Sequence, residues 1–436
     1  MPGKACSWRL ISSDTRDTKV DIMTAINDFS ENQIKSIVDI VDAPSSAGEF
    51  PGFNPDPTLP SSPLVQLGDR EHLVVHSVWG LRTTILLISI KDGSVKNLTP
   101  LEDNLPYSWM PFEVVLGEFD DQGNVSWRVL QESLSLLPQS VQDGLRALKV
   151  GIITIPDRHP TESILVQQSK LEEGHIPPHI LIPHGGPHAT SVVRFDVTVA
   201  GFALEGYNVS VPNYTGSLGF GETHVRALIG NCSTLDVGDC IASVRHMVKL
   251  GVAEEAPSKL FMVGGSHGGF LTGHLIGQYP DTFTAASLCN PVMSCGEVST
   301  SDIRDWFWAE FGRDYPIQSS EVGSDGCSIP VVKSVGVMTP ELYGVLFKAS
   351  PIAYVEKVKA AVLLCIGGSD KCVAPTQGID YYHALKAARA KGKNGLKSDN
   401  DDGVEMLWFQ EDEAFTTVAP GDFFIHRLAI WILKIH

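Results

Sequence analysis

The residues best suited to chemistry are at 264–268, where Gly-Gly-Ser-His-Gly has the form G-x-S-x-G and directly follows the apolar run 259–263. In a nucleophile elbow, a serine occupies a strained strand-to-helix turn, and glycines flank it because side chains would collide with the backbone. Such a turn exposes the hydroxyl to a substrate carbonyl. The pattern therefore predicts Ser266 as a nucleophile; the alternative is a glycine-rich turn with no chemistry.

A second glycine motif lies upstream, where the apolar run 179–183 leads into His-Gly-Gly-Pro at 184–187. Backbone N–H groups of such a loop, with the N–H of the residue after the nucleophile, form an oxyanion hole that stabilises a tetrahedral intermediate. We therefore predict Gly186 and His267 as the two donors. The alternative is a tight glycine turn between a strand and a helix.

The acid of a serine triad in this order follows the serine and lies at the end of a later strand. The apolar run 360–367 is such a strand, and Asp370 comes three residues after it. We predict that Asp370 orients a histidine and stabilises its charged form. An ordinary aspartate in a surface turn is the alternative.

The elements that would position these residues begin at about residue 146. Short apolar runs are expected as strands, and amphipathic segments between them as helices. The predicted strands are 179–183, 207–214, 259–263, 284–290, 360–367 and 405–409, and the predicted helices include 239–250, 269–278 and 376–390. Strands that are apolar on both faces and alternate with helices indicate a mostly parallel sheet covered on both sides.

The first part of the chain has a different pattern. The segments HLVVHSVW and TTILLISIKDGSVKNLT are typical of antiparallel strands with a turn at 91–93, as in a propeller blade. Residues 42–63, rich in proline, serine and glycine, are expected to be a loop or linker. We therefore predict two domains, a partial β-propeller over 1–145 and an α/β domain over 146–436.

Composition excludes several classes of function. The chain of 436 residues has a formal net charge of −18, which argues against binding to nucleic acids or anionic membranes. It has no apolar run of about 18 residues and no apolar segment typical of a signal peptide, so we expect a soluble, cytoplasmic protein. The eight cysteines have no metal-ligand spacing, and no phosphate loop or dinucleotide fingerprint occurs. We expect neither a metal nor a cofactor.

Several further motifs carry a resemblance to a known family. HGGPHA, NYTGSLGFG, GGSHGGF with HLIGQYP, NPV, SPIAY and GIDYYHALK occur in this order along the chain. In these motifs the sequence resembles the acylaminoacyl-peptidases (acylpeptide hydrolases) of the prolyl oligopeptidase class. The resemblance implies an α/β-hydrolase domain behind a β-propeller. It also implies an exopeptidase that removes an N-acylated, typically N-acetylated, residue from short peptides without a cofactor.

The sequence departs from that family at the catalytic base. The family places the histidine after the last strand in a segment like Phe-Pro-x-x-x-His-Ala, whereas residues 409–415 read FQEDEAF and Glu413 stands at the expected position. Beyond Asp370 the only histidines are His383, His426 and His436, and the first two fall in predicted helices. Three explanations stay open: a natural pseudoenzyme, a splice form or gene prediction with an altered last exon, and a site that recruits another histidine.

The first domain also departs from the family, because about 145 residues suffice for only about three propeller blades of 40 to 50 residues. We therefore expect a truncated form of a longer protein. Three functions remain: an acylaminoacyl-peptidase acting on short N-acylated peptides, a carboxylesterase-like hydrolase with a more open site, and a catalytically silent interaction protein. The sequence leaves the assembly open between a homo-oligomer and a mixed oligomer with active relatives.

Overall fold

The structure is a computed structural model in which the following parts of the chain are described. They are residues 10–13, 34–45, 48–54, 60, 62–99, 113–120, 122–132, 136–169, 174–297, 308–313, 318–322, 328–332, 338–392 and 403–410.

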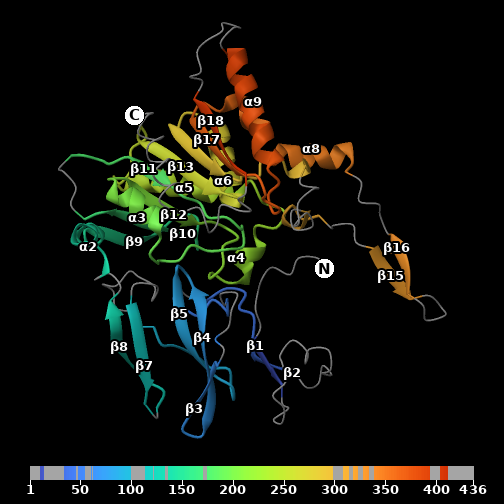
Figure 1. Ribbon diagram of the computed structural model, residues 1–436. Helices are drawn as coiled ribbons and strands as arrows, with labels where there is room; N and C mark the ends of the chain where they lie inside the picture. The colour runs from blue at the N-terminus through green and yellow to red at the C-terminus, as the bar shows by residue number, and fades with distance from the viewer. Residues whose placement is uncertain are drawn as a thin grey trace.

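An eight-stranded sheet forms the centre of the second part of the chain, with strand order β18-β17-β14-β13-β11-β12-β10-β9 (Figure 1). The strands are β9 Leu148–Thr154, β10 Glu162–Gln168, β11 His179–Leu181, β12 Asn208–Asn213, β13 Leu260–Gly265, β14 Ala285–Cys289, β17 Ala361–Gly367 and β18 Val404–Phe409. Neighbours from β12 to β18 pair in parallel, whereas β10 is antiparallel to both β9 and β12. The predicted mostly parallel sheet is confirmed, with the antiparallel strands β9 and β10 added at one edge.

Alternate side chains of the inner strands β13, β14 and β17 enter different cores. On β13, Leu260 and Met262 belong to a cluster that includes residues of α5, α6 and α9, whereas Phe261 and Val263 belong to one that includes residues of α3. The helices are α3 Val197–Leu204, α5 Leu235–Lys249, α6 His267–Gln278 and α9 Thr376–Gly392. Apolar burial on both faces explains why these strands read as continuous apolar runs in the sequence.

Shorter elements complete the second part of the chain. They are α2 Gln139–Arg146, α4 Glu222–Arg226, α8 Pro340–Lys348, the 3-10 helices η3 Cys295–Glu297 and η4 Pro351–Lys357, and the antiparallel pair β15 Gln318–Val322 and β16 Ser328–Val332. The predicted domain division between residues 145 and 146 falls inside α2, and it stays a proposal.

The first part of the chain contains a four-stranded antiparallel sheet in sequence order, the arrangement of a propeller blade. Its strands are β3 Leu64–Leu67, β4 Arg70–Trp79, β5 Arg82–Ser89 and β6 Val95–Asn97, and two further pairs are β1 Leu10–Ser13 with β2 Ile34–Val38 and β7 Glu113–Phe119 with β8 Val125–Glu132. The predicted turn at 91–93 is confirmed, because Gly93 has φ 73° and its N–H donates to the carbonyl of Ser89 at 2.8 Å.

The two parts of the chain contact each other through backbone hydrogen bonds. The N–H of Gly80, in the β4–β5 turn, donates to the carbonyl of Gly219 at 2.8 Å. The carbonyl of Leu81 in the same turn accepts from the N–H of Val193 at 2.7 Å. The β4–β5 turn therefore docks on two loops that belong to the central-sheet region.

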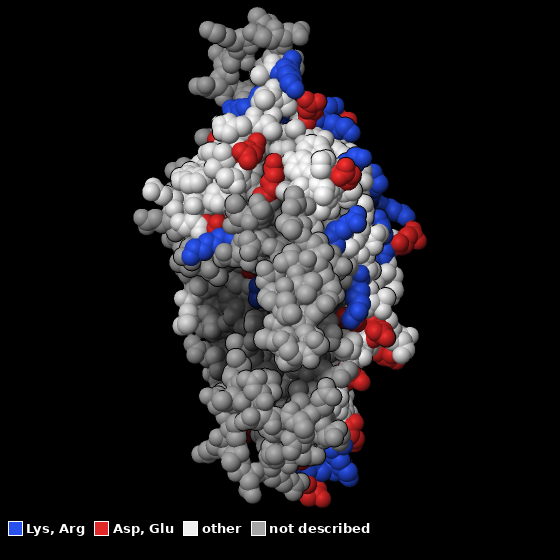
Figure 2. Space-filling view, turned by 90° about the vertical axis from the view of Figure 1, so that its right-hand side faces the viewer, with Lys and Arg blue, Asp and Glu red and all other residues white. Residues whose placement is uncertain are grey.

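On the face drawn in Figure 2, the described acidic and basic side chains are interspersed rather than gathered by sign. None of the described helices is both long and apolar enough to cross a bilayer.

Candidate active site

Ser266 lies between β13 and α6, and its backbone has φ 55° and ψ −120°. A positive φ in a residue with a side chain is sterically costly, and such strain persists only where neighbouring structure enforces it. Here the N–H of Ser266 donates to the carbonyl of Cys289 on β14 at 3.0 Å, and its carbonyl accepts from Phe270 on α6 at 3.0 Å. The strand-to-helix turn predicted from G-x-S-x-G is present at residue 266.

The glycines around Ser266 are required by close backbone approaches. A Cβ atom on Gly264 would lie 2.2 Å from the carbonyl oxygen of Gly268. One on Gly268 would lie 2.3 Å from the carbonyl oxygen of Pro183, the residue directly before the HGGP loop. Because both obstacles are backbone atoms, no side-chain rotation relieves them, and glycine is needed at both positions.

The HGGP loop lies directly against the serine. A Cβ atom on Gly185 would lie 3.5 Å from Cβ and 4.0 Å from Oγ of Ser266. Gly186 has φ 122° and is joined to Pro187 by a cis peptide bond. The segment that carries the proposed oxyanion donor Gly186 is therefore a direct neighbour of the proposed nucleophile.

His184 supports this loop rather than supplying a base. Its Nδ1–H donates to the carbonyl of Gly185 at 2.6 Å, its Nε2 lies 2.8 Å from Ser217 Oγ, and the Tyr214 hydroxyl donates to its carbonyl at 2.8 Å. The His184 and Tyr214 rings stack with their centroids 4.3 Å apart. Burial lowers the pKa of His184 to about 4, so its imidazole is neutral at pH 7.

The side chains of His267 and His188 also form hydrogen bonds with residues other than Ser266 and Asp370. The Nε2 atom of His267 lies 3.0 Å from Oδ2 of buried Asp236, so its side chain points into the interior and its backbone N–H is the group left for the proposed oxyanion role. His188 bonds the carbonyl of Gly216 through Nδ1 at 2.8 Å and Glu310 through Nε2 at 3.1 Å. Burial alone would lower the pKa of His188, but the hydrogen bond and the charge of Glu310 outweigh it and raise the pKa.

Asp370 is buried at the end of β17, and its carboxylate has defined partners. Oδ1 accepts from the N–H groups of Cys372 at 2.8 Å and Val373 at 2.9 Å, and Oδ2 accepts a short hydrogen bond from the side chain of Asn290. The Asn290 side chain in turn accepts from the N–H of Gly367 at 2.7 Å. Asn290 follows β14, so two adjacent strands of the sheet fix the orientation of this carboxylate.

The last described residues before the segment expected to hold the base lie next to the turn that carries Asp370. The N–H of Gly368 donates to the carbonyl of Phe409 at 2.7 Å, and Ser369 Oγ donates to that of Gln410 at 3.1 Å. Residues 411–436, and with them Glu413, His426 and His436, lie outside the described residues. His383 lies on α9, in the predicted helix 376–390, and its side chain is exposed. Within the described ranges, no histidine is hydrogen-bonded to Asp370.

Two supporting residues were not assigned roles from the sequence. Asn290 orients Asp370 from 80 residues away, and Asp236 holds His267 from 31 residues away. A polar residue directly after the apolar run 284–289 was a usable signal for Asn290, because the carboxyl ends of parallel strands meet at one edge of a sheet. No local signal identified Asp236.

The sequence matches two protein-family models and several known enzymes. Residues 193–322 match the model of the prolyl oligopeptidase family, and residues 18–117 match that of the acylamino-acid-releasing enzyme N-terminal domain. An acylamino-acid-releasing enzyme of Arabidopsis thaliana is 31% identical over 81% of this chain and 48% of its own length. Acylamino-acid-releasing enzyme 2 of Oryza sativa is 31% identical over 92% of this chain and 52% of its own.

A solved structure supports the fold alone. The acylaminoacyl peptidase of Pyrococcus horikoshii superposes with a TM-score of 0.60 at 17% identity, covering 85% of this chain and 54% of that one. The chain thus spans about half the length of the relatives it matches. Its sheet order, its serine elbow and these matches agree, and the chain belongs to the acylaminoacyl-peptidase branch of the prolyl oligopeptidase (S9) family.

Proposed function

We propose that this chain is a serine hydrolase of the acylaminoacyl-peptidase type, which releases an N-acylated amino acid from short peptides through an acyl-enzyme on Ser266. The observation that carries the proposal is the strained backbone of Ser266, with φ 55°, held against the HGGP loop. Strain of this kind is retained where the surrounding structure enforces it, and it presents the hydroxyl to a substrate.

In the proposed reaction, Ser266 Oγ attacks the carbonyl carbon of the amide that follows the acylated residue. The N–H groups of Gly186 and His267 stabilise the oxygen that becomes negative in the tetrahedral intermediate. The leaving amine takes up a proton, the acylated residue stays as an ester on Ser266, and water then hydrolyses that ester. Asp370 orients the base that accepts the serine proton and stabilises its charge.

The base itself must come from beyond Gln410 or from another position outside the described residues. The position of Gln410 supports the first of these sources. Its carbonyl accepts a hydrogen bond from Ser369, the residue before Asp370, so the segment after Gln410 begins beside the proposed acid. A carboxylate at Glu413, with an ordinary pKa near 4.3, is a poor acceptor for a serine proton unless its surroundings raise that pKa strongly. A histidine recruited from the undescribed part of the chain is the alternative that preserves full activity.

A specific observation favours a second candidate function, a catalytically silent interaction protein with the same fold. Within the described ranges, the hydrogen bonds of Asp370 go to Asn290, Cys372 and Val373, and the histidines near the serine are bound elsewhere. Loss of the histidine from a serine triad costs about a million-fold in kcat, leaving about a thousand-fold over water. Such a protein would keep the oxyanion hole and bind peptides or relatives without turnover.

The proposal is tested by the rate of hydrolysis of N-acetyl-alanyl p-nitroanilide by the purified chain, beside Ser266→Ala. We expect turnover that the substitution abolishes. Equal rates for the two proteins would reject the hydrolase and favour the silent protein. Parallel assays with p-nitrophenyl esters separate a peptidase from a carboxylesterase-like hydrolase, since the latter would turn over the ester and leave the anilide intact.

A further inference from the structure

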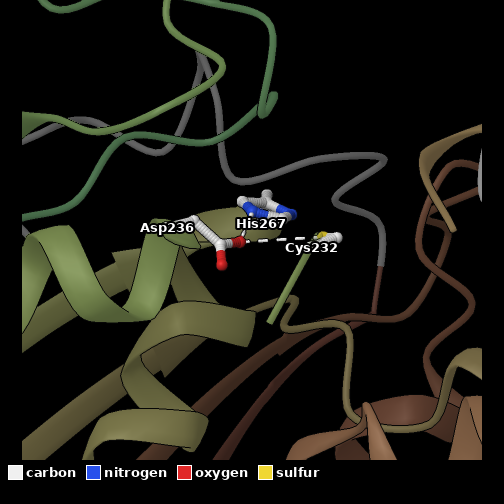
Figure 3. A group of neighbouring side chains, drawn as sticks. All are labelled: Cys232, Asp236 and His267. Carbon is white, nitrogen blue, oxygen red and sulfur yellow. Dashed lines mark hydrogen bonds and ion pairs between the residues drawn. The ribbon is translucent and has the colours of Figure 1, made fainter. Parts of the chain in front are cut away.

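Three buried side chains with metal-binding atoms meet beneath the serine elbow, and the proposed reaction does not use them. They are Cys232, Asp236 and His267, and their ligand atoms all lie within 4.8 Å of one another. In Figure 3, Asp236 faces both of the other two side chains. Among the described residues, this is the one group of three or more such side chains close enough to share an ion.

The distances within this cluster, which we call the Cys-Asp-His cluster, suit a tetrahedral ion. Cys232 Sγ lies 3.6 Å and His267 Nε2 lies 3.0 Å from Oδ2 of Asp236. In a tetrahedral zinc site, with bonds of about 2.3 Å to sulfur and about 2.0 Å to oxygen and nitrogen, sulfur and oxygen are about 3.5 Å apart and nitrogen and oxygen about 3.3 Å apart. The two distances to Oδ2 differ from these values by about 0.1 and 0.3 Å, and the sulfur–nitrogen distance is at most 4.8 Å, so side-chain adjustment of Cys232 and His267 would complete the tetrahedral arrangement.

Two of the three ligands lie on helices, and the third lies in the turn before α5. Asp236 is in the first turn of α5, Cys232 lies four residues before it, and His267 is the first residue of α6. Oδ1 of Asp236 accepts from the N–H of Val237 at 2.9 Å, which leaves Oδ2 to face the other two ligands. The imidazole of His267 stacks on Phe270 with ring centroids 4.9 Å apart, which fixes its orientation. Fixed second partners of this kind orient metal ligands.

Charge and ligand type favour a divalent ion that accepts both sulfur and nitrogen. The exposed fractions of the residues Cys232, Asp236 and His267 are 6%, 0% and 4%. A thiolate, a carboxylate and a neutral imidazole carry two negative charges, so one Zn²⁺ makes the buried set neutral and avoids the cost of an uncompensated buried charge. Binding forms zinc bonds to Sγ of Cys232, Oδ2 of Asp236 and Nε2 of His267. The thiol proton is released to solvent, and the neutral imidazole exchanges its Nε2 proton for one on Nδ1, because zinc binds the thiolate and an unprotonated ring nitrogen.

We propose that Cys232, Asp236 and His267 form a structural zinc site that fixes the first residue of α6 beneath the serine elbow. The three protein ligands leave one position of the tetrahedron for a neutral ligand. The site is distinct from the proposed reaction, because the ligands lie in the interior. It does not depend on whether the chain is catalytically active.

The first test is the zinc content of tag-free protein that is expressed with added zinc and then dialysed against metal-free buffer. All proteins carry Cys372→Ser, which removes an exposed thiol. We expect about one zinc per chain in this background, as for a structural zinc site. We expect the same content in Cys240→Ala, the matched control at a fully buried cysteine outside the cluster, and its loss in Cys232→Ala. A zinc-free background protein, or equal zinc in both alanine variants, would overturn the proposal.

A second measurement does not depend on whether Cys232→Ala folds. The background protein is refolded with Co²⁺ in place of zinc, and its absorption spectrum is recorded. A tetrahedral site with one thiolate gives a sulfur-to-cobalt charge-transfer band in the near ultraviolet together with visible bands of tetrahedral cobalt. Refolded protein without these bands, as checked by its far-ultraviolet circular dichroism, would contradict the zinc site.

Discussion

At the scale of single residues, the candidate site depends on positions that tolerate one residue type for a stated reason. Gly264 and Gly268 are fixed by backbone atoms 2.2 and 2.3 Å from where a Cβ would be. The residue types at 370 and 290 are fixed by the direction of a hydrogen bond, because the Asp370 carboxylate accepts from the Asn290 amide. Each reason predicts a different response to mutation.

Gly268→Ala should destabilise the protein, because its Cβ would overlap the carbonyl oxygen of Pro183. Overpacking of this kind costs about 1–3 kcal/mol. Gly344→Ala is the matched control, because Gly344 lies within α8 with no atom within 4 Å of its Cβ position, and alanine in a helix is favoured by about 0.5–1 kcal/mol. Urea unfolding of both variants measures the difference. A Gly268→Ala protein as stable as the wild type would mean that the elbow and the HGGP loop are farther apart than described.

Asp370→Asn should destabilise the protein by about 1–3 kcal/mol, because two amide NH₂ groups would then face each other in a buried position. Adding Asn290→Asp reverses donor and acceptor and restores each of these hydrogen bonds, so the double variant should regain most of the stability. In a serine triad, replacing the aspartate by asparagine lowers kcat about 10⁴-fold, and the swap should leave activity low. Recovery of stability together with full activity in the double variant would exclude Asp370 as the triad acid.

At the scale of elements, the docking of the β4–β5 turn on the central-sheet region rests on glycine. A Cβ on Gly219, which has φ 93°, would lie 2.7 Å from Val78 and 2.8 Å from the carbonyl oxygen of Gly80. Gly219→Ala should therefore loosen β4 and β5 and speed their amide hydrogen exchange. Gly251→Ala is the control for backbone strain without a clash, because Gly251 has φ 72° but no atom within 4 Å of its Cβ position. If amide exchange in β4 and β5 is the same in both variants, the clash at residue 219 adds nothing to the effect of backbone strain.

The elements near the site were predictable to different degrees. The strands β11, β12, β13, β14, β17 and β18 were predicted within about two residues, because each lies in a short, mainly apolar run with a glycine or a polar residue close to its end. The antiparallel strands β9 and β10 were missed, because polar residues lie within or on both sides of their short apolar runs. The Ser266 turn was predictable because its geometry is encoded within five residues. The pairs Asn290–Asp370 and Asp236–His267 were not, because only the folded sheet brings such distant residues together.

At the scale of the whole molecule, buried histidines make stability depend on pH. Burial lowers the pKa of four described histidines to about 4: His179, His184, His224 and His274. The ordinary pKa of histidine, which we take for the unfolded chain, is about 6.5. As the pH falls from 6.5 to about 4, the unfolded chain binds protons that the folded chain does not. The free energy of unfolding should therefore fall over this window.

His274 tests this dependence at one position. Its Nε2–H donates to the carbonyl of Ala349 at 3.1 Å, and its Nδ1 accepts from Gln278 at 2.9 Å, so the surroundings match the neutral ring. His274→Gln should reduce the slope of unfolding free energy between pH 6.5 and 4 by up to about 1.4 kcal/mol per pH unit. His383→Gln, at an exposed histidine of α9, should leave the slope unchanged. The comparison uses slopes rather than absolute stabilities, and equal slopes for both variants would refute the buried, neutral state of His274.

The most direct test of the central claim, that Ser266 is an activated nucleophile, is its reaction with a fluorophosphonate. The intact chain is incubated with the probe, and the modified peptide is identified by mass spectrometry beside Ser266→Ala. The account predicts a phosphonate adduct on Ser266, absent from the variant and suppressed by prior denaturation, because the oxyanion hole and a base act together only in the folded chain. A folded wild-type protein without this adduct would contradict the claim and leave a family member whose serine elbow is intact but silent.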